Sequence, residues 1–252
     1  MVRRVFGSGN GRAERDDTTA TAADPEPADV VAGAAGRAGG AAPAGLTAEI
    51  DRRVIRLFAL VEEAVAGATH ALLSGDRARA REVVAADADL DAFYYELEAL
   101  VKDRVVNGGL STQEVTWLLA VLSMLPELER SGDLAEHVAQ RATRNLPAEI
   151  PARARGYIER MGEVACEMWR MAADAYADRL DGTERLDLLD DQMDDLHVQF
   201  IAELVTGAMP VPVAIELALV GRFYERLGDH AVNLTRRVPQ RSGLRIGTPT
   251  AS

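Results

Sequence analysis

The sequence predicts an all-α fold made of two tandem antiparallel three-helix bundles in an elongated body. Three observations lead to this prediction. Apolar residues recur at intervals of three and four in six long segments, which is the period of a helix. None of these segments alternates convincingly with the period of two that marks a strand. Aromatic residues make up only 5%, so a core must rely on Leu, Val and Ala, which suits packed helices.

Three helices are expected in the first bundle, residues 46–147. The first ends at the Ser-Gly-Asp sequence 74–76, which is typical of a turn. The second covers 77–106 and ends at an Asn-Gly-Gly sequence. The third opens at Ser111, which forms a capping-box pattern with Glu114, and is expected to end near Pro147.

Three further helices are expected in the second bundle, residues 148–239. The first, 148–180, stops at an Asp-Gly sequence, and the second, 183–206, ends before Gly207. The third, 212–239, begins and ends at prolines. At 1.5 Å per residue, helices of about this length form rods of roughly 40 Å, which is why an elongated body is expected.

The two ends of the chain are expected to be tails. Ala, Gly and Pro supply 23 of the first 45 residues, and such a segment is too poor in large apolar side chains to form a core. Residues 1–45 are therefore predicted to be a disordered tail, and residues 240–252 a flexible C-terminal tail.

Charge and composition exclude several classes of partner. The net charge is −12, so we expect no nucleic-acid partner, which would need clustered Lys and Arg. Cys166 is the only cysteine, which excludes an internal disulfide and a multi-cysteine zinc site. No uncharged apolar run of about 18 residues occurs, so no membrane insertion is expected. The first residues do not form a signal-peptide pattern, so a cytoplasmic location is expected.

Acidic residues recur in pairs at corresponding places in the two halves. The sequence Glu-Arg-x-Gly-Asp occurs at 129–133 and again at 225–229, and an Asp-x-x-x-Asp pair precedes each copy. Each pair has i, i+4 spacing on one helix face, which costs a helix about 0.2–0.5 kcal/mol. A glycine within a helix costs a further ~1 kcal/mol relative to alanine. The pairs are Asp87 and Asp91, Glu129 and Asp133, Asp190 and Asp194, and Glu225 and Asp229.

Two interpretations of these pairs remain open on the sequence. Facing antiparallel helices can bring two pairs together, and four close carboxylates that do not protonate or splay apart need a cation as their counter-charge. The glycine would then remove a side chain where the facing helix or the ion comes close. Alternatively, the acids form solvated helix faces, with Arg130 and Arg226 as ordinary surface partners.

The segments ELERSGDLAEHVA and RFYERLGDHAVNLTRRV resemble the two signature helices of the PhoU family of phosphate-uptake regulators. The resemblance covers about residues 46–238, and the second half is the closer match. It implies two similar three-helix bundles that bind multinuclear metal clusters, often iron or zinc, through E/D-x-x-x-D motifs. The implied ligands are Asp87, Asp91, Glu129, Asp133, Asp190, Asp194, Glu225 and Asp229. Oxygen ligands alone would suit magnesium, manganese or iron better than a soft metal.

The first half departs from the family pattern at two places near its motif. His137 stands where the second half has Asn233, four residues beyond Asp133, so it is either an added imidazole ligand or a histidine without such a role. Pro126, three residues before Glu129, is expected to kink its helix.

The resemblance implies a non-enzymatic regulator that represses the phosphate-starvation response when phosphate is plentiful. Its implied partners are the ATPase subunit of the phosphate-specific ABC transporter and a sensor histidine kinase, with a homodimer as the default assembly. Two alternatives remain: a carboxylate-bridged metal enzyme and a purely structural helical interaction module. Against the enzyme alternative, the sequence has no Glu-x-x-His pair of the kind that di-iron bundles use. The nearest match is Asp194-x-x-His197, which occurs once. No phosphate-binding loop of an ATPase occurs either.

Overall fold

The computed structural model describes residues 44–144, 146–178, 183–207 and 209–238. Within these ranges the chain is helical and contains no strand, which confirms the predicted all-α class. The helices are α1 (Ala44–Ser74), α2 (Arg77–Val106), α3 (Thr112–Ala142), α4 (Leu146–Glu149), α5 (Ala152–Asp178), α6 (Thr183–Thr206) and α7 (Val211–Arg237). The two predicted tails lie outside the described residues, apart from the last two residues of 1–45, which begin α1.

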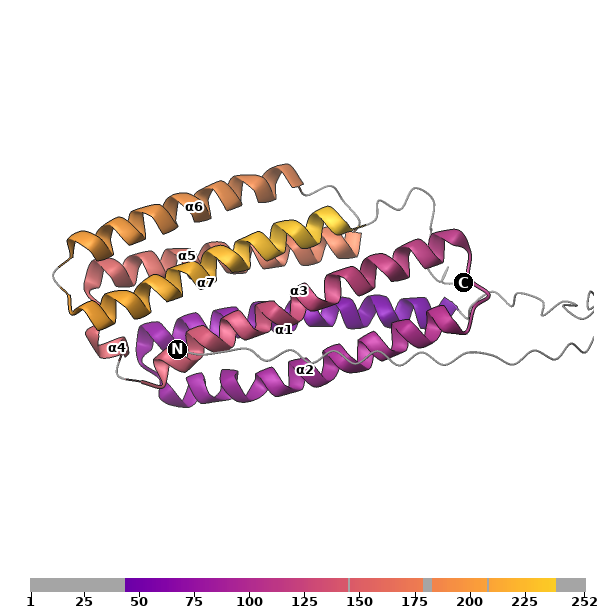
Figure 1. Cartoon of the computed structure of the whole chain (residues 1–252), viewed down its shortest axis with the longest axis horizontal. Coiled ribbons are helices and arrows are strands. Elements are labelled where there is room, and N and C mark those ends of the chain that lie inside the picture. Colours follow the sequence, from indigo (N-terminus) through magenta and orange to yellow (C-terminus); the bar gives the residue numbers. More distant parts are fainter. Residues whose placement is uncertain (1–43, 145, 179–182, 208, 239–252) are drawn as a thin grey trace, which may run out of the picture. The chain divides into compact units, whose positions relative to one another are not determined.

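The six long helices form two three-helix units (Figure 1). Helices α1, α2 and α3 all contact one another, and so do α5, α6 and α7. The two units meet where α1 contacts α5 and where α3 contacts α7. The predicted pair of three-helix bundles is thereby confirmed, with the helices lying lengthwise side by side (Figure 1).

Local sequence signals explain the end of α1 and the starts of α2 and α3. Gly75 takes a positive φ of 73° between α1 and α2, a conformation that favours glycine. The Asp76 carboxylate then caps α2 by accepting hydrogen bonds from the backbone N–H groups of Ala78 and Arg79. Ser111 and Glu114 form the predicted capping box at the start of α3. These boundaries were therefore predictable from short-range chemistry.

The connection between the units differs from the prediction. Helix α3 ends at Ala142, the single turn α4 follows, and α5 begins at Ala152, whereas continuous helices to about 146 and from 148 were expected. Pro151 explains the break before α5, because proline disfavours a helical residue before it and lacks the N–H that would continue the helix. Pro126 lies inside α3, which continues through it as one helix.

An apolar contact joins the units along α1 and α5. The ring of Phe58 lies 5.9 Å from that of Trp169 and 5.8 Å from that of Tyr176, and all three side chains are buried. The Tyr176 hydroxyl donates a hydrogen bond of 2.9 Å to the Asp51 carboxylate. Since large aromatic side chains contribute most of the burial energy in such contacts, this one binds the two units firmly.

By length and composition, α1 is also apolar enough to cross a membrane. Half of its most apolar stretch is buried inside the structure, as is usual for a core helix of a helical bundle.

Candidate functional site

The first acidic set consists of Asp87 and Asp91 on α2 and Glu129 and Asp133 on α3. Gly132 controls how closely these helices approach. A Cβ atom at this position would lie 3.2 Å from Oδ1 of Asp87 and 3.0 Å from Cδ1 of Leu90. The glycine in the motif therefore makes room for the α2 carboxylate, as the sequence interpretation requires.

The four carboxylates of the first set perturb one another. The pKa of Asp87 is raised to about 6; burial is the largest cause, and the charges of Glu136, Asp133, Asp91 and Glu129 contribute in that order of size. The pKa values of Glu129 and Asp133 are also raised, first by burial and then by their acidic neighbours. The structure thus brings together the residues that the repeat predicted.

Glu136 is an acidic neighbour that the sequence analysis did not include. It belongs to no E/D-x-x-x-D pair, yet its charge is the largest of the acidic contributions to the raised pKa of Asp87. Its position, seven residues after Glu129, places it on the same face of α3, a spacing that could have identified it.

The second acidic set lies between α6 and α7. A Cβ atom at Gly228 would lie 3.6 Å from Oδ1 of Asp190, so this glycine again faces the partner carboxylate. Burial raises the pKa of Asp190, and the charges of Asp194 and Asp229 add to that shift. Burial also raises the pKa of Glu225, to which Asp229 contributes. The second predicted set is therefore assembled as the first one is.

Arginines neutralise part of the second set. Arg222, one turn before the motif, forms an ion pair with Oε1 of Glu225. Arg236 is near enough to lower the pKa of Asp190, although burial and the acidic neighbours outweigh it. The other oxygen of Glu225, Oε2, is buried and has no hydrogen-bond partner within the described part of the chain. Such an orphaned carboxylate oxygen is the kind of group that a cation satisfies.

The acidic sets suit a metal ion in the chemistry of their donor atoms, but the carboxylates are not arranged in a coordination geometry. Both sets offer only carboxylate oxygens, which suit hard cations such as magnesium and manganese. Among the described residues, no three Asp, Glu, His or Cys side chains converge closely enough to hold an ion as they stand. The ring of His137 stacks on Phe223 at 5.5 Å, which gives this histidine a packing role. A bound cation would thus require rotations of the carboxylates.

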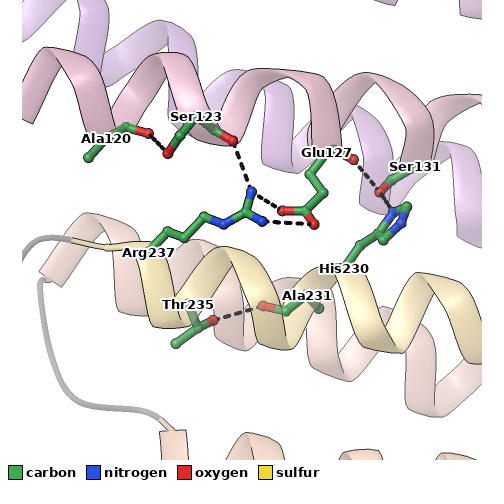
Figure 2. A network of polar contacts seen from close by, with 8 residues as sticks. All are labelled: Ala120, Ser123, Glu127, Ser131, His230, Ala231, Thr235 and Arg237. Carbon is green, nitrogen blue, oxygen red and sulfur yellow. Dashed lines mark hydrogen bonds and ion pairs between the residues drawn. The ribbon is translucent and has the colours of Figure 1, made fainter.

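A polar network links the two motif-bearing helices, α3 and α7 (Figure 2). The Arg237 guanidinium lies 2.5 Å from Oε2 of Glu127 and donates a 2.9 Å hydrogen bond to the backbone carbonyl of Ser123. Further along, Oγ of Ser131 lies 2.9 Å from Nδ1 of His230. These partners lie on the helix faces opposite the acidic sets, so the acidic repeat gave no signal of them.

Fold and site together define a class of helical protein with two repeated three-helix units. In each unit, carboxylates lie on two facing helices, and a glycine on one helix makes room for a carboxylate of the other. The PhoU domain model matches residues 54–142 and 158–238, and the chain belongs to this family. The match covers both units and includes all eight predicted acidic residues.

Two curated relatives illustrate the similarity. The phosphate-specific transport system accessory protein PhoU homolog 1 of Mycobacterium leprae is 31% identical over 203 residues, covering 75% of this chain and 87% of the relative. The PhoU homolog 2 of Mycobacterium tuberculosis is 29% identical over 194 residues, covering 75% and 91%.

Solved structures show the same fold. PhoU from Pseudomonas aeruginosa superposes with a TM-score of 0.72 at 23% identity, covering 77% of this chain and 95% of that protein. The phosphate transport system regulatory protein PhoU from Streptococcus pneumoniae gives 0.67 at 18% identity, covering 78% and 95%. The architecture of two repeated helical units is therefore shared with these proteins.

Proposed function

We propose that this protein is a non-enzymatic regulator of phosphate uptake and of the phosphate-starvation response. The observation that carries the proposal is the PhoU domain match in both halves, since each match includes one copy of the glycine-spaced acidic motif. The similar proteins from Mycobacterium are named accessory proteins of the phosphate-specific transport system, which supports a regulatory role for this chain.

The proposed partners are the ATPase subunit of the phosphate-specific ABC transporter and a sensor histidine kinase, and the proposed location is the cytoplasm. A net charge of −12 supports selective protein partners over nucleic acid. A homodimer is the proposed assembly, because two-fold symmetry is the commonest arrangement of helical proteins that self-associate.

The acidic sets are proposed to hold divalent or trivalent metal ions. Carboxylates whose pKa values are raised by burial and by one another have much to gain from a cation, which removes the repulsion. Oxygen donors favour magnesium, manganese or iron, with zinc as a weaker fit. In the regulator, such ions would hold α2 to α3 and α6 to α7, and they would fix the surface that a partner binds.

The chemistry of the other reactive groups argues against an enzyme. Burial raises the pKa of the Cys166 thiol to about 11, so this group stays protonated and is a poor nucleophile. The Ser131–His230 pair has the spacing of a nucleophile and its base, but Ser131 is 0% exposed and His230 is 7% exposed. The Ser131 hydroxyl also donates its proton to the Glu127 carbonyl, so the His230 nitrogen that faces it does not act as its base.

A genetic test distinguishes a phosphate regulator from a structural helical module. Deletion of the gene should leave phosphate-starvation genes expressed in phosphate-rich medium, and the full-length chain should restore repression. The strain must also lack any second gene of the same family, since a paralogue could mask the effect. Normal repression in the deletion strain, together with pull-downs that recover neither transporter nor kinase, would contradict the proposal.

A further inference from the structure

The contact between α3 and α7 has an internal two-fold pattern. Along the seam, residues pair in antiparallel order, from Glu127 with Arg237 to Arg141 with Glu216. Arg141 and Arg237 are 96 positions apart, which is also the spacing between the two Gly-Asp motifs. The two arginines are therefore equivalent residues of the repeat, and they lie at opposite ends of one seam.

The two ends of the seam use these equivalent arginines differently. At one end, Arg237 pairs with Glu127. At the other end, Phe223 occupies the position equivalent to Glu127, and the Arg141 guanidinium lies over its ring at 4.8 Å. Arg141 also forms an ion pair of 2.9 Å with Glu216. The Arg237 side chain is 43% exposed and that of Arg141 only 11%, so the Arg237 end is the more open to water.

The centre of the seam is polar as well. The Ser131 hydroxyl donates to the backbone carbonyl of Glu127 at 2.6 Å, so its oxygen accepts from the Nδ1–H of His230 at 2.9 Å. Polar and ionic groups like these regain much of their energy from water when the helices part.

The α1–α5 contact is more apolar, although it includes the Tyr176–Asp51 hydrogen bond. Its aromatic side chains lose apolar burial if they separate, which water does not replace. The short connection through α4 also ties α3 to α5 close to the Arg141 end of the seam, since only ten residues separate Arg141 from Ala152.

We propose that α3 and α7 form a clamp that separates along the seam, while the α1–α5 contact and α4 keep the two units joined. Ser131 lies between Glu129 and Asp133, and His230 follows Asp229 directly. Opening the clamp therefore displaces the first acidic set relative to the second. This inference concerns the helix contacts alone and stands whether or not the acidic sets bind metal.

Thiol labelling at the centre of the seam tests the clamp. The full-length reporter carries Ser131→Cys, with Cys166→Ala to remove the native thiol. Arg237→Gln should accelerate the reaction of the reporter thiol with a maleimide about tenfold, the factor that corresponds to ~1.4 kcal/mol. The matched control is Arg236→Gln, because Arg236 pairs with Asp187 inside the second unit and not across the seam. Equal labelling rates in the two variants, with native circular dichroism, would overturn the proposal.

A second measurement leaves the seam side chains untouched in the reference protein. Spin labels on Ala92→Cys of α2 and Ala202→Cys of α6, both exposed positions in different units, report the distance between the units. With Cys166→Ala in all samples, Arg237→Gln should broaden the distance distribution towards longer values, whereas Arg236→Gln should not. Identical distributions would show a rigid contact and contradict the clamp, even if the Ser131→Cys reporter fails to fold.

Discussion

The two acidic sets carry the same motif but differ in their surroundings. In the first set, Glu136 adds a further negative charge beside Asp87, and Arg130 only partly offsets the raised pKa values of Glu129 and Asp133. In the second set, Arg222 pairs with Glu225, and Arg236 lies close to Asp190. The set that departs more from the family sequence pattern therefore holds the more uncompensated charge. Agreement with a motif and demand for a counter-ion are separate properties.

Replacing one buried acid in each set provides the largest expected contrast. An aspartate whose folded pKa is raised binds its proton more tightly in the folded state, so its ionised form costs stability as the pH rises through the folded pKa. For Asp87 this loss develops between about pH 4 and the folded pKa of about 6. In chelator at pH 7.5, Asp87→Asn should be more stable than wild type by about 1–2 kcal/mol, a value reduced for solvent screening of this half-buried group.

Urea unfolding at pH 7.5 and pH 4 measures this contrast. The advantage of Asp87→Asn should vanish near pH 4, where the wild-type carboxyl is already protonated. Asp190→Asn should show a smaller advantage, because Arg236 offsets part of the repulsion. Asp174→Asn, an exposed site on α5, is the control and should be neutral. An Asp87 variant that is no more stable than wild type at pH 7.5 would show that the first set is solvated and relaxed.

The two motif glycines should give a smaller contrast. A Cβ at Gly132 meets Cδ1 of Leu90 at 3.0 Å, whereas a Cβ at Gly228 meets the flexible end of Met168 at 3.3 Å. Overpacking typically costs 1–3 kcal/mol, against a helix-propensity gain of ~1 kcal/mol for alanine. Gly132→Ala should therefore destabilise the protein by about 1 kcal/mol, and Gly228→Ala should be close to neutral. Chemical denaturation decides it, and equal effects would mean that the two helix pairs approach equally closely.

Much of the fold could be predicted from short-range signals. The cap at Asp76 and the capping box at Ser111 depend only on neighbouring residues, so the helix starts there match the prediction. The acidic sets were also predictable, because i, i+4 spacing places each pair on one face and the repeat matches the faces of two helices. The break at Pro151 was not predicted, since one helix was expected over 148–180, although a proline at this place could have indicated it.

The α3–α7 seam could not be predicted in the same way. The partners Glu127 and Arg237 are 110 residues apart, and their pairing depends on the register between two units. Ser131 occupies the variable position of the motif, and in the second copy that position holds Leu227. A single sequence gives no signal that this serine contacts His230. Contacts set by the docking of whole helices need the tertiary structure.

The most direct test of the central claim is a count of metal ions held by the acidic sets. The full-length protein is equilibrated with Mn²⁺, freed of unbound ions by gel filtration and examined by elemental analysis, alongside Asp87→Asn, Asp190→Asn, their combination and the Asp174→Asn control. Each single variant should lose the ions of one set, the combination should lose nearly all, and the control should match wild type. Two results would contradict the assignment of these carboxylates as cation ligands. One is wild-type protein that binds no manganese after equilibration at a saturating concentration, and the other is a double variant that retains the full amount.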